Sequence, residues 1–388
     1  MKKIFRTILK TIKWTFLVIV GLAIISVVYN LTLPEHSEIV EHLSEKEKAY
    51  VAETMNLQQK LGNEVWPGWG ELHIPAIVYN EEYAFLIGYS NPPAGWYKMP
   101  VEEFRGAGWE IVETDDFFGK TYYRQVLPNP DITPENFTVK VGNRWVTTMQ
   151  TKEYAAVAFY KGFKKELPPL LNAIFPYKIF WNMLMGKAEN YICGMAHEAF
   201  HAFQGTVVPE RLAESEFASQ LSSDYPWEKS VNAEVWIEET NLLLAAYYAE
   251  SKDEAKQLVA QFTGKRHERR EGSGLTNEMV QYEQKREWLE GLAKYAELKI
   301  GLCAQESKAY SPIDEITEVS GFKNYKNRTS YFNRQIEEVK RTAARSGESR
   351  FYYVGMLQAV LLDRLMPEWK SAAFNNGIYL ENLLANIN

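Results

Sequence analysis

Residues 194–205 read Gly-Met-Ala-His-Glu-Ala-Phe-His-Ala-Phe-Gln-Gly. In this stretch His197 and His201 are four positions apart, and Glu198 follows the first histidine. Residues i and i+4 lie one turn apart on the same face of a helix, so both imidazoles can reach one metal ion. The neighbouring residues are uncharged, which predicts a helix packed against its neighbours, with Gly205 at its C-terminal cap. The stretch therefore predicts a buried two-histidine zinc site in which Glu198 holds a water on the metal and acts as general base and acid.

A zinc site of this kind needs a third protein ligand and keeps one position open. The other histidines lie far upstream or in a basic stretch: His36, His42, His73 and His267. The third ligand is therefore expected to be a carboxylate, as in gluzincin-type sites. Two segments offer one: a predicted helix with Glu234, Glu238 and Glu239, and the stretch that contains Glu290.

The stretch Trp288-Leu-Glu-Gly-Leu-Ala-Lys-Tyr295 resembles the zinc-ligand helix of the aminopeptidase-N-like gluzincins, the peptidase MA group. This resemblance implies Glu290 as the third zinc ligand. The stretch Tyr352-Tyr-Val-Gly355, followed by an apolar helix, resembles the part of these enzymes whose tyrosine donates a hydrogen bond to the oxyanion. The resemblance covers residues 187–365 loosely and implies this role for Tyr352, which is typically worth a few kcal/mol.

The chain also departs from the family pattern. The asparagine before the ligand glutamate is missing, and the stretch from His201 to Glu290 is longer, so a helical insertion near residues 207–275 is expected. The Gly-x-Met-Glu-Asn signature that binds a free N-terminus is absent from the sequence, so aminopeptidase activity is not implied. Glu234-x-x-x-Glu238 resembles the Glu-x-x-x-Asp pair of thermolysin-like enzymes, where the first acid binds zinc. Glu290 is the favoured ligand, and the carboxylates of the other helix stay open as alternatives.

The first residues predict a membrane anchor. Basic side chains, among them Lys2, Lys3 and Arg6, precede an apolar run of about 20 residues from Trp14 to Leu33, which is long enough to span a bilayer. Acidic residues follow the run, so the N-terminus is expected in the cytoplasm and the body outside. Because no small-x-small cleavage pattern follows, an uncleaved single-pass anchor is expected rather than a signal peptide.

The fold expected is α+β. Residues 1–34 form the basic segment and anchor. Residues 35–165 contain short β-branched and aromatic runs between prolines and glycines, which predicts a strand-rich, mostly antiparallel α+β domain. Residues 166–388 show helical periodicity and predict a mostly helical, zincin-like domain.

Individual elements follow from the same patterns. A helix over 44–61 is expected, with Ser44 as N-cap, Glu47 completing a capping box and Gly62 past its end. The expected strands are Ile74–Tyr79, Ala84–Tyr89, Trp109–Glu113, Thr121–Leu127, Phe137–Val141 and Tyr154–Tyr160. The expected later helices lie near 168–174, 187–204, 231–250, 253–263, 276–302, 330–345, 351–365 and 378–386.

Composition excludes several classes of protein. The chain of 388 residues has 46% hydrophobic and 24% charged residues, which is typical of globular proteins. Its formal net charge is −7, and no large basic patch points to a nucleic-acid partner. The stretch Lys265–Arg270 is interpreted as a solvated loop or helix end. The two cysteines, Cys193 and Cys303, are too few for a disulfide scaffold or a cysteine-based zinc site.

These features combine into one hypothesis. The sequence predicts a zinc metallopeptidase of the cell membrane that cleaves a peptide or protein substrate outside the cytoplasm. Zinc is bound by His197, His201 and Glu290, Glu198 is the base, and Tyr352 stabilises the oxyanion. The alternative is a catalytically inactive zincin-fold protein with a binding or structural role in the cell envelope.

Overall fold

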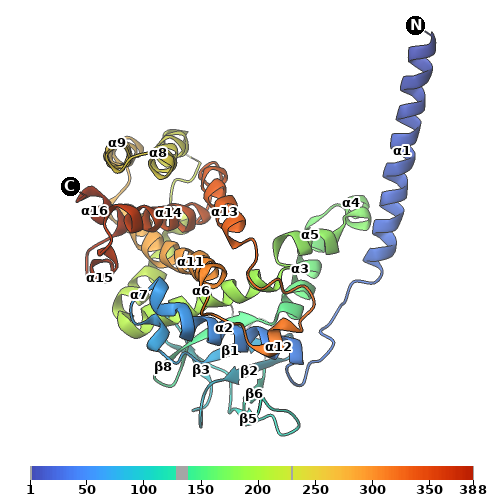
Figure 1. The fold of residues 1–388 in the computed structure, drawn as a ribbon, viewed down its shortest axis with the longest axis horizontal. Helices are drawn as coiled ribbons and strands as arrows, with labels where there is room; N and C mark the ends of the chain where they lie inside the picture. Colours follow the sequence, from blue (N-terminus) through green and yellow to red (C-terminus); the bar gives the residue numbers. More distant parts are fainter. Residues whose placement is uncertain (1, 128–138, 229, 388) are drawn as a thin grey trace.

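The computed structural model describes residues 2–127, 139–228 and 230–387. It confirms the α+β class: a curled sheet lies at one end of a mainly helical body, and one long helix at the N-terminus extends away from it (Figure 1). The large core combines residues from both regions expected beyond the anchor, from Leu43 to Leu384. Cys193 is buried, Cys303 is half-buried, and both are free thiols.

The N-terminal helix is α1 (Lys2–Asn30). Its part from Lys10 to Asn30 is long and apolar enough to cross a membrane. Twenty-one residues at 1.5 Å per residue give about 30 Å, the thickness of the hydrocarbon core of a bilayer. Large apolar side chains along this helix, such as Phe16 and Ile24, are exposed.

Within the described residues the sheet has eight strands in the spatial order β4-β3-β7-β8-β1-β2-β6-β5. Among the described strands β1 and β8 pair in parallel, and the other neighbours pair antiparallel. The strands are β1 (Ala76–Tyr79), β2 (Tyr83–Ile87), β3 (Trp96–Lys98), β4 (Glu103–Arg105), β5 (Glu110–Ile111), β6 (Tyr123–Val126), β7 (Val139–Val141) and β8 (Arg144–Gln150). Residues 137 and 138 of an expected strand lie outside the described residues, and β3, β4 and β8 were not expected.

The helices of the body lie on one side of the sheet and pack on one another (Figure 1). In the first half they are α2 (Glu45–Val65), the 3-10 turn η1 (Trp69–Glu71), α3 (Lys152–Glu166), α4 (Pro169–Ile174), α5 (Tyr177–Leu184), α6 (Ala188–Val207), α7 (Pro209–Phe217) and the 3-10 turn η2 (Ala218–Ser223). In the second half they are α8 (Ser230–Tyr248), α9 (Lys252–Ser273), α10 (Asn277–Arg286), the π-helical turn η3 (Glu287–Gly291), α11 (Leu292–Glu306), α12 (Asp314–Thr317), α13 (Arg328–Ala343), α14 (Ser349–Leu365), α15 (Trp369–Ala373) and α16 (Leu380–Ala385). The helix expected over 276–302 is thus interrupted by a π turn.

The predicted strand Tyr154–Tyr160 is wrong, because these residues belong to helix α3. Thr151 caps this helix by accepting a hydrogen bond from the amide of Tyr154. The carboxylate of Glu47 accepts two more, from the amides of Lys152 and Glu153, at 3.0 and 2.9 Å. Three otherwise unpaired amides are thereby satisfied, which favours a helix over a strand.

The N-terminus of α2 differs in one respect from its prediction. Ser44 is the N-cap, and its side chain accepts a hydrogen bond from the amide of Glu47. The predicted capping box is wrong, because the Glu47 carboxylate caps α3 instead. Burial raises the pKa of Glu47 to about 7. The helix also continues past Gly62 and ends at Val65.

Helix α6 carries the histidine motif and lies close to the sheet. Gly205 is not its cap, because the helix ends at Val207. A Cβ at Gly205 would lie 2.5 Å from Cδ2 of Trp145 on β8, so a side chain there would clash. On the same helix, Phe200 packs edge-on against the buried Trp69 at 5.2 Å between ring centroids. Because Gly205 has no side chain, α6 can approach Trp145 of β8 closely, and the Phe200–Trp69 contact fixes its distance from η1.

Helices η3 and α14 cross at two glycines. A Cβ at Gly291 would lie 2.5 Å from Cα of Gly355. A Cβ at Gly355 would meet the backbone carbonyl of Glu287 at closer range still. The crossing therefore requires glycine on both sides, and it places Tyr352, one turn before Gly355, beside the turn that carries Glu290.

The basic stretch Lys265–Arg270 is not a solvated loop or helix end, because its arginines on α9 form buried ion pairs. Arg266 binds both carboxylate oxygens of Glu287 on η3 at 2.8 Å. Arg269 binds Glu239 on α8 and Glu283 on α10. Arg266 and Arg270 both reach Glu381 on α16, and the i, i+3 and i+4 spacing puts these arginines on one inward face of α9. The hairpin α8–α9 is therefore joined to the rest of the body by charge pairing.

Replacing Gly355 by alanine tests the helix crossing. We expect Gly355→Ala to destabilise the chain by about 2 kcal/mol, because the new methyl group would overlap the carbonyl of Glu287. Gly264→Ala on α9 is the matched control: its Cβ would meet nothing within 4 Å, so stability should stay the same or rise. Thermal unfolding of the full chain in detergent measures both, and equal melting temperatures for Gly355→Ala and the unchanged chain would contradict the crossing.

The charge network predicts acid sensitivity. Burial opposes the charge of Glu381, but Arg270 and Arg266 outweigh it and lower the pKa to about 2. A carboxyl with a lowered folded pKa contributes stability above its unfolded pKa of about 4.5 and loses it as the pH falls toward 2. That contribution is of the order of 3 kcal/mol.

Urea unfolding of the full chain between pH 7 and pH 3 would measure this contribution. Stability should fall steeply below about pH 4.5. Glu381→Gln should lower stability at pH 7 and make the decline below pH 4.5 shallower. The same pH slope in both proteins would show that Glu381 does not contribute in this way.

Candidate metal centre

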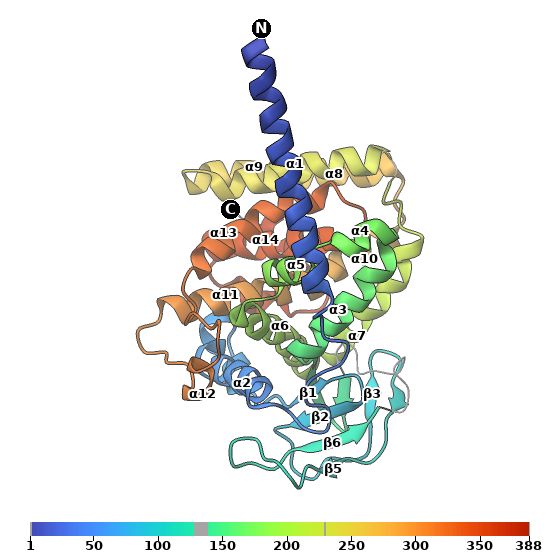
Figure 2. The same cartoon turned by 90° about the vertical axis from the view of Figure 1, so that its right-hand side faces the viewer.

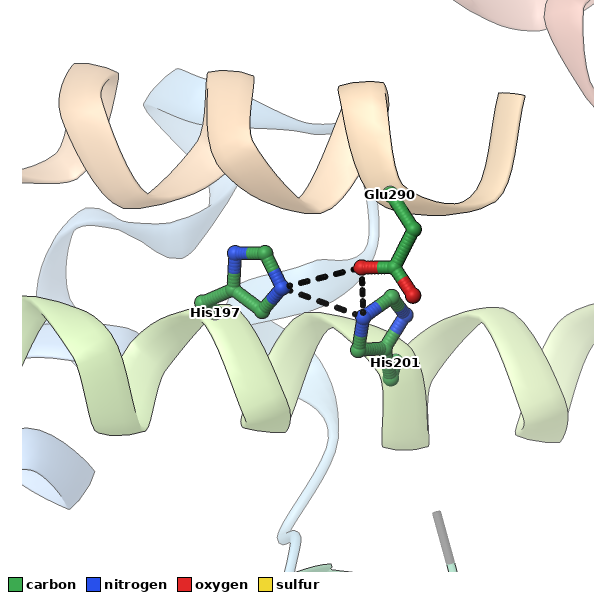
Figure 3. Close-up of side chains that lie close together, drawn as sticks. All are labelled: His197, His201 and Glu290. Atoms are coloured by element: carbon green, nitrogen blue, oxygen red, sulfur yellow. Dashed lines mark hydrogen bonds and ion pairs between the residues drawn. The ribbon is translucent and has the colours of Figure 1, made fainter. Parts of the chain in front are cut away.

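Three ligand atoms meet between α6 and η3 (Figure 3). Nε2 of His197 lies 3.4 Å from Oε2 of Glu290, and Nε2 of His201 lies 3.3 Å from the same oxygen. The two Nε2 atoms are 3.2 Å apart. All three side chains are buried. The structure therefore brings together the two motif histidines and the carboxylate that the family resemblance implies.

The spacing of these atoms fits a tetrahedral metal ion. Zinc binds histidine nitrogen and carboxylate oxygen at about 2.0–2.2 Å, and the corners of a tetrahedron of that size are about 3.3–3.6 Å apart. The three observed separations, 3.2, 3.3 and 3.4 Å, are close to this range. The donor set of two imidazoles and one carboxylate leaves a fourth corner for water or substrate. The residues present therefore fit a zinc ion.

Gln204 sets the orientation of His201. Its Oε1 lies 2.8 Å from Nδ1 of His201, and its Nε2 donates toward the carbonyl of Leu289 at 3.4 Å. Since the amide nitrogen faces a carbonyl, the amide oxygen faces the histidine and accepts the Nδ1 proton. In the neutral imidazole this leaves Nε2 with a free lone pair, which is the form that binds metal.

Glu297 faces the outer ring nitrogen of His197 as a charged neighbour, without a hydrogen bond in this structure. Its Oε2 lies 3.5 Å from Nδ1 of His197, and its Oε1 accepts a hydrogen bond of 2.7 Å from Lys294. Burial opposes the charge of Glu297, but Lys294 and His197 outweigh it and lower the pKa to about 2. A carboxylate behind a ligand histidine is a common feature of zinc sites, because it orients the ring and increases its basicity.

Arg286 keeps Glu290 ionised. Its Nη2 donates to Oε1 of Glu290 at 2.8 Å, which leaves Oε2 for the histidines. Burial opposes ionisation, but Arg286 and the two histidines outweigh it and hold the pKa of Glu290 well below its usual range. Arg286 also contacts Glu216 and Glu348, so its own charge is shared among three carboxylates.

Carboxylates surround the two imidazoles with negative charge. Burial disfavours a charged His197, but the carboxylates of Glu290 and Glu297 outweigh it and raise the pKa of His197 to about 10. The pKa of His201 is raised as well, against burial, chiefly by Glu290. If both imidazoles were protonated, their Nε2–H groups would point at each other across 3.2 Å and repel. One divalent cation between the two Nε2 atoms would avoid this repulsion and bind both lone pairs.

Glu198 and Tyr352 lie beside this group. Burial raises the pKa of Glu198 to about 7, and the charges of His197 and His201 act in the opposite direction. A bound divalent cation would add to that lowering. The Tyr352 ring lies parallel to the His197 ring, with centroids 6.1 Å apart. Burial and then the Glu290 charge raise the pKa of Tyr352, so its hydroxyl stays a proton donor.

The alternative carboxylates lie elsewhere. Glu239 is buried and paired with Arg266 and Arg269. Glu238 lies 3.5 Å from Lys265 and is largely exposed, and Glu234 is exposed on α8. None of them belongs to the metal-ligand group formed by His197, His201 and Glu290 among the described residues.

Three supporting residues were not expected from the sequence. Gln204 follows His201 by three positions, and Arg286 and Glu297 lie four before and seven after Glu290. These spacings place Gln204 and Arg286 near the ligand that each supports, whereas Glu297 reaches His197 from α11, a different helix. The spacing is visible in the sequence, but it identifies these residues only when His201 and Glu290 are known to meet.

No family model, curated protein or solved structure matches this chain. The case for a function therefore depends on the geometry and chemistry of the site.

Metal binding tests the choice of the third ligand. Glu290→Gln should weaken Zn²⁺ binding by at least about 10-fold, because it removes a ligand charge that both histidines face. Glu234→Gln, an identical chemical change on an exposed residue of α8, should bind Zn²⁺ as the unchanged chain does. Equilibrium dialysis of the full chain in detergent, with metal analysis, measures both. Retained affinity in Glu290→Gln together with lost affinity in Glu234→Gln would transfer the ligand role to α8.

Proposed function

We propose that this chain is a zinc-dependent peptide hydrolase attached to the cell membrane. The observation that carries the proposal is the group of three buried ligand atoms, 3.2–3.4 Å apart, with Glu198 next to it in the sequence. Two imidazoles and one carboxylate suit zinc, whereas calcium and magnesium prefer oxygen ligands alone. Three protein ligands with an open fourth position are typical of catalytic rather than structural zinc sites.

A zinc ion bound there would polarise a substrate carbonyl and lower the pKa of a water. Glu198 would take a proton from the attacking water and later deliver it to the leaving amine. Tyr352, protonated at neutral pH, would donate a hydrogen bond to the oxygen on which negative charge develops. Gln204 holds the imidazole of His201 by a hydrogen bond, and the carboxylate of Glu297 lies beside that of His197.

The substrate proposed is a peptide or protein outside the cytoplasm. Helix α1 contains a stretch, Lys10–Asn30, that is long and apolar enough to anchor the chain in a bilayer. Basic residues before this stretch and acidic ones after it favour a cytoplasmic N-terminus. The zincin-like character of the helical part and the likeness to the peptidase MA group belong to the same proposal.

Replacing the base separates metal binding from turnover. Glu198→Gln should keep Zn²⁺ and lose at least about 10²-fold in peptide hydrolysis, since general acid–base catalysis contributes that much or more. Glu234→Gln is the control for the same chemical change away from the site and should keep both properties. The measurement is cleavage of a peptide library, read by mass spectrometry, with the full zinc-loaded chain in detergent.

Two outcomes would contradict the proposal. Equal cleavage by Glu198→Gln and the unchanged chain would exclude this glutamate as the base. An unchanged chain that binds Zn²⁺ and cleaves no peptide would favour the alternative, an inactive zincin-fold protein with a binding or structural role in the envelope.

A further inference from the structure

Helices α4 and α5 expose large apolar side chains next to the membrane anchor. On α4, Leu170 is 77% exposed and Leu171 is 50% exposed. On α5, Ile179 and Met183 are one turn apart on one face and are 64% and 72% exposed. Leu184 follows them with 47% exposed. The described body would leave these side chains in water unless another apolar phase covers them.

The sequence of this region is apolar and aromatic, with positive charge at both ends. Residues 167–186 contain no acidic residue, and Lys178 is their one charged side chain. Lysines flank the stretch on both sides: Lys161, Lys164, Lys165 and Lys187. Prolines interrupt it at 168, 169 and 176, so it forms two short helices rather than a second spanning helix. Apolar and aromatic helices with basic flanks are typical of segments that lie in a membrane interface.

Direct contacts tie this region to the end of α1. The side-chain amide of Asn30, the last residue of α1, donates to the carbonyls of Ala173 and Phe175 at 2.9 Å each. Just beyond the helix, Leu33 packs in a small core with Tyr177 and Trp181. Figures 1 and 2 both show α4 beside the lower part of α1. The exposed apolar side chains therefore lie at the end of the stretch that can cross a bilayer.

We propose that α4 and α5 form an interfacial surface that enters the same membrane leaflet in which α1 ends. The apolar side chains of α4 and α5 lie at the boundary between headgroups and acyl chains, and the flanking lysines contact lipid phosphates. This inference rests on the proposed anchor. Helix α9 is drawn above α4 in Figure 1, level with the middle of α1, and it exposes Lys252, Asp253 and Glu254 in its first turn. Because such charges stay outside the hydrocarbon, α1 would cross the bilayer at a tilt that leaves α9 in water.

The surface has a consequence for the metal centre. A single spanning helix leaves the body free to rotate and tilt over the membrane. Attachment through both α1 and α4–α5 restricts that motion, because the hydrogen bonds of Asn30 fix the end of α1 to the last turn of α4 and the segment that joins it to α5. The body, and with it the centre on α6, then has one orientation relative to the membrane.

Depth-dependent quenching tests the surface. Single cysteines at Leu170, Met183, Ile19 and Val126, introduced into the full chain, are labelled with bimane and reconstituted in phosphatidylethanolamine–phosphatidylglycerol vesicles. Nitroxide lipids labelled near the headgroup should quench Leu170→Cys and Met183→Cys at least about twofold, as expected for an interfacial segment. Deep nitroxides should quench Ile19→Cys on α1. Val126→Cys, 59% exposed on β6 far from α1, should resist both, and the unmutated chain corrects for label on native thiols.

Each outcome decides a separate point. Quenching of Ile19→Cys with Leu170→Cys and Met183→Cys no more quenched than Val126→Cys would overturn the surface and leave the anchor. Absence of deep quenching at Ile19→Cys would overturn the anchor and the surface together, without bearing on hydrolysis. If the bimane emission at Met183→Cys is shifted to the blue but neither nitroxide lipid quenches it, protein rather than lipid covers the surface, and the proposal is overturned. Adding Ile179→Asp to Met183→Cys should reduce its quenching if apolar burial holds the segment in the lipid.

Discussion

One carboxylate oxygen of Glu290 lies between two imidazole nitrogens, 3.4 Å from His197 and 3.3 Å from His201. A charge buried in this way is costly unless it is paired. Arg286 pairs the other oxygen and keeps the carboxyl ionised, and the ionised carboxyl in turn helps to raise the pKa of both histidines. The chemistry of the centre follows from this balance, because removing Arg286 would leave the buried charge of Glu290 without its closest cation.

The surrounding helices serve to hold that oxygen in place. The π turn η3 carries Glu290, and its backbone packs on α14 through glycines at 291 and 355. The hairpin α8–α9 reaches the same turn through the Arg266–Glu287 pair, so the long stretch between the two motifs is bound to the ligand-bearing segment. A π turn widens the helix by one residue and is frequent at functional sites, since it changes which side chains face inward.

The sequence indicated the site where local spacing was sufficient. The pair of histidines is set by the helical repeat, and a histidine shortage made a carboxylate the expected third ligand. It was misleading where the deciding partner lay far along the chain. Tyr154–Tyr160 resembled a strand, but Glu47 caps these residues as a helix from about a hundred positions away. The arginines of α9 resembled a solvated run, but they are buried in ion pairs with carboxylates on four other segments.

The sequence by itself determined the α+β class, an apolar helix long enough for a membrane, and two histidines on one helix face, because these depend on length and on periods of a few residues. Only the tertiary structure decided which carboxylate meets them. Glu239 and Glu290 are both buried glutamates on helices, and the difference is that Arg266 and Arg269 neutralise one while Arg286 leaves an oxygen of the other free. The local stretch around Glu290 favoured it only by resemblance, because such pairing depends on contacts between residues that are distant in the chain.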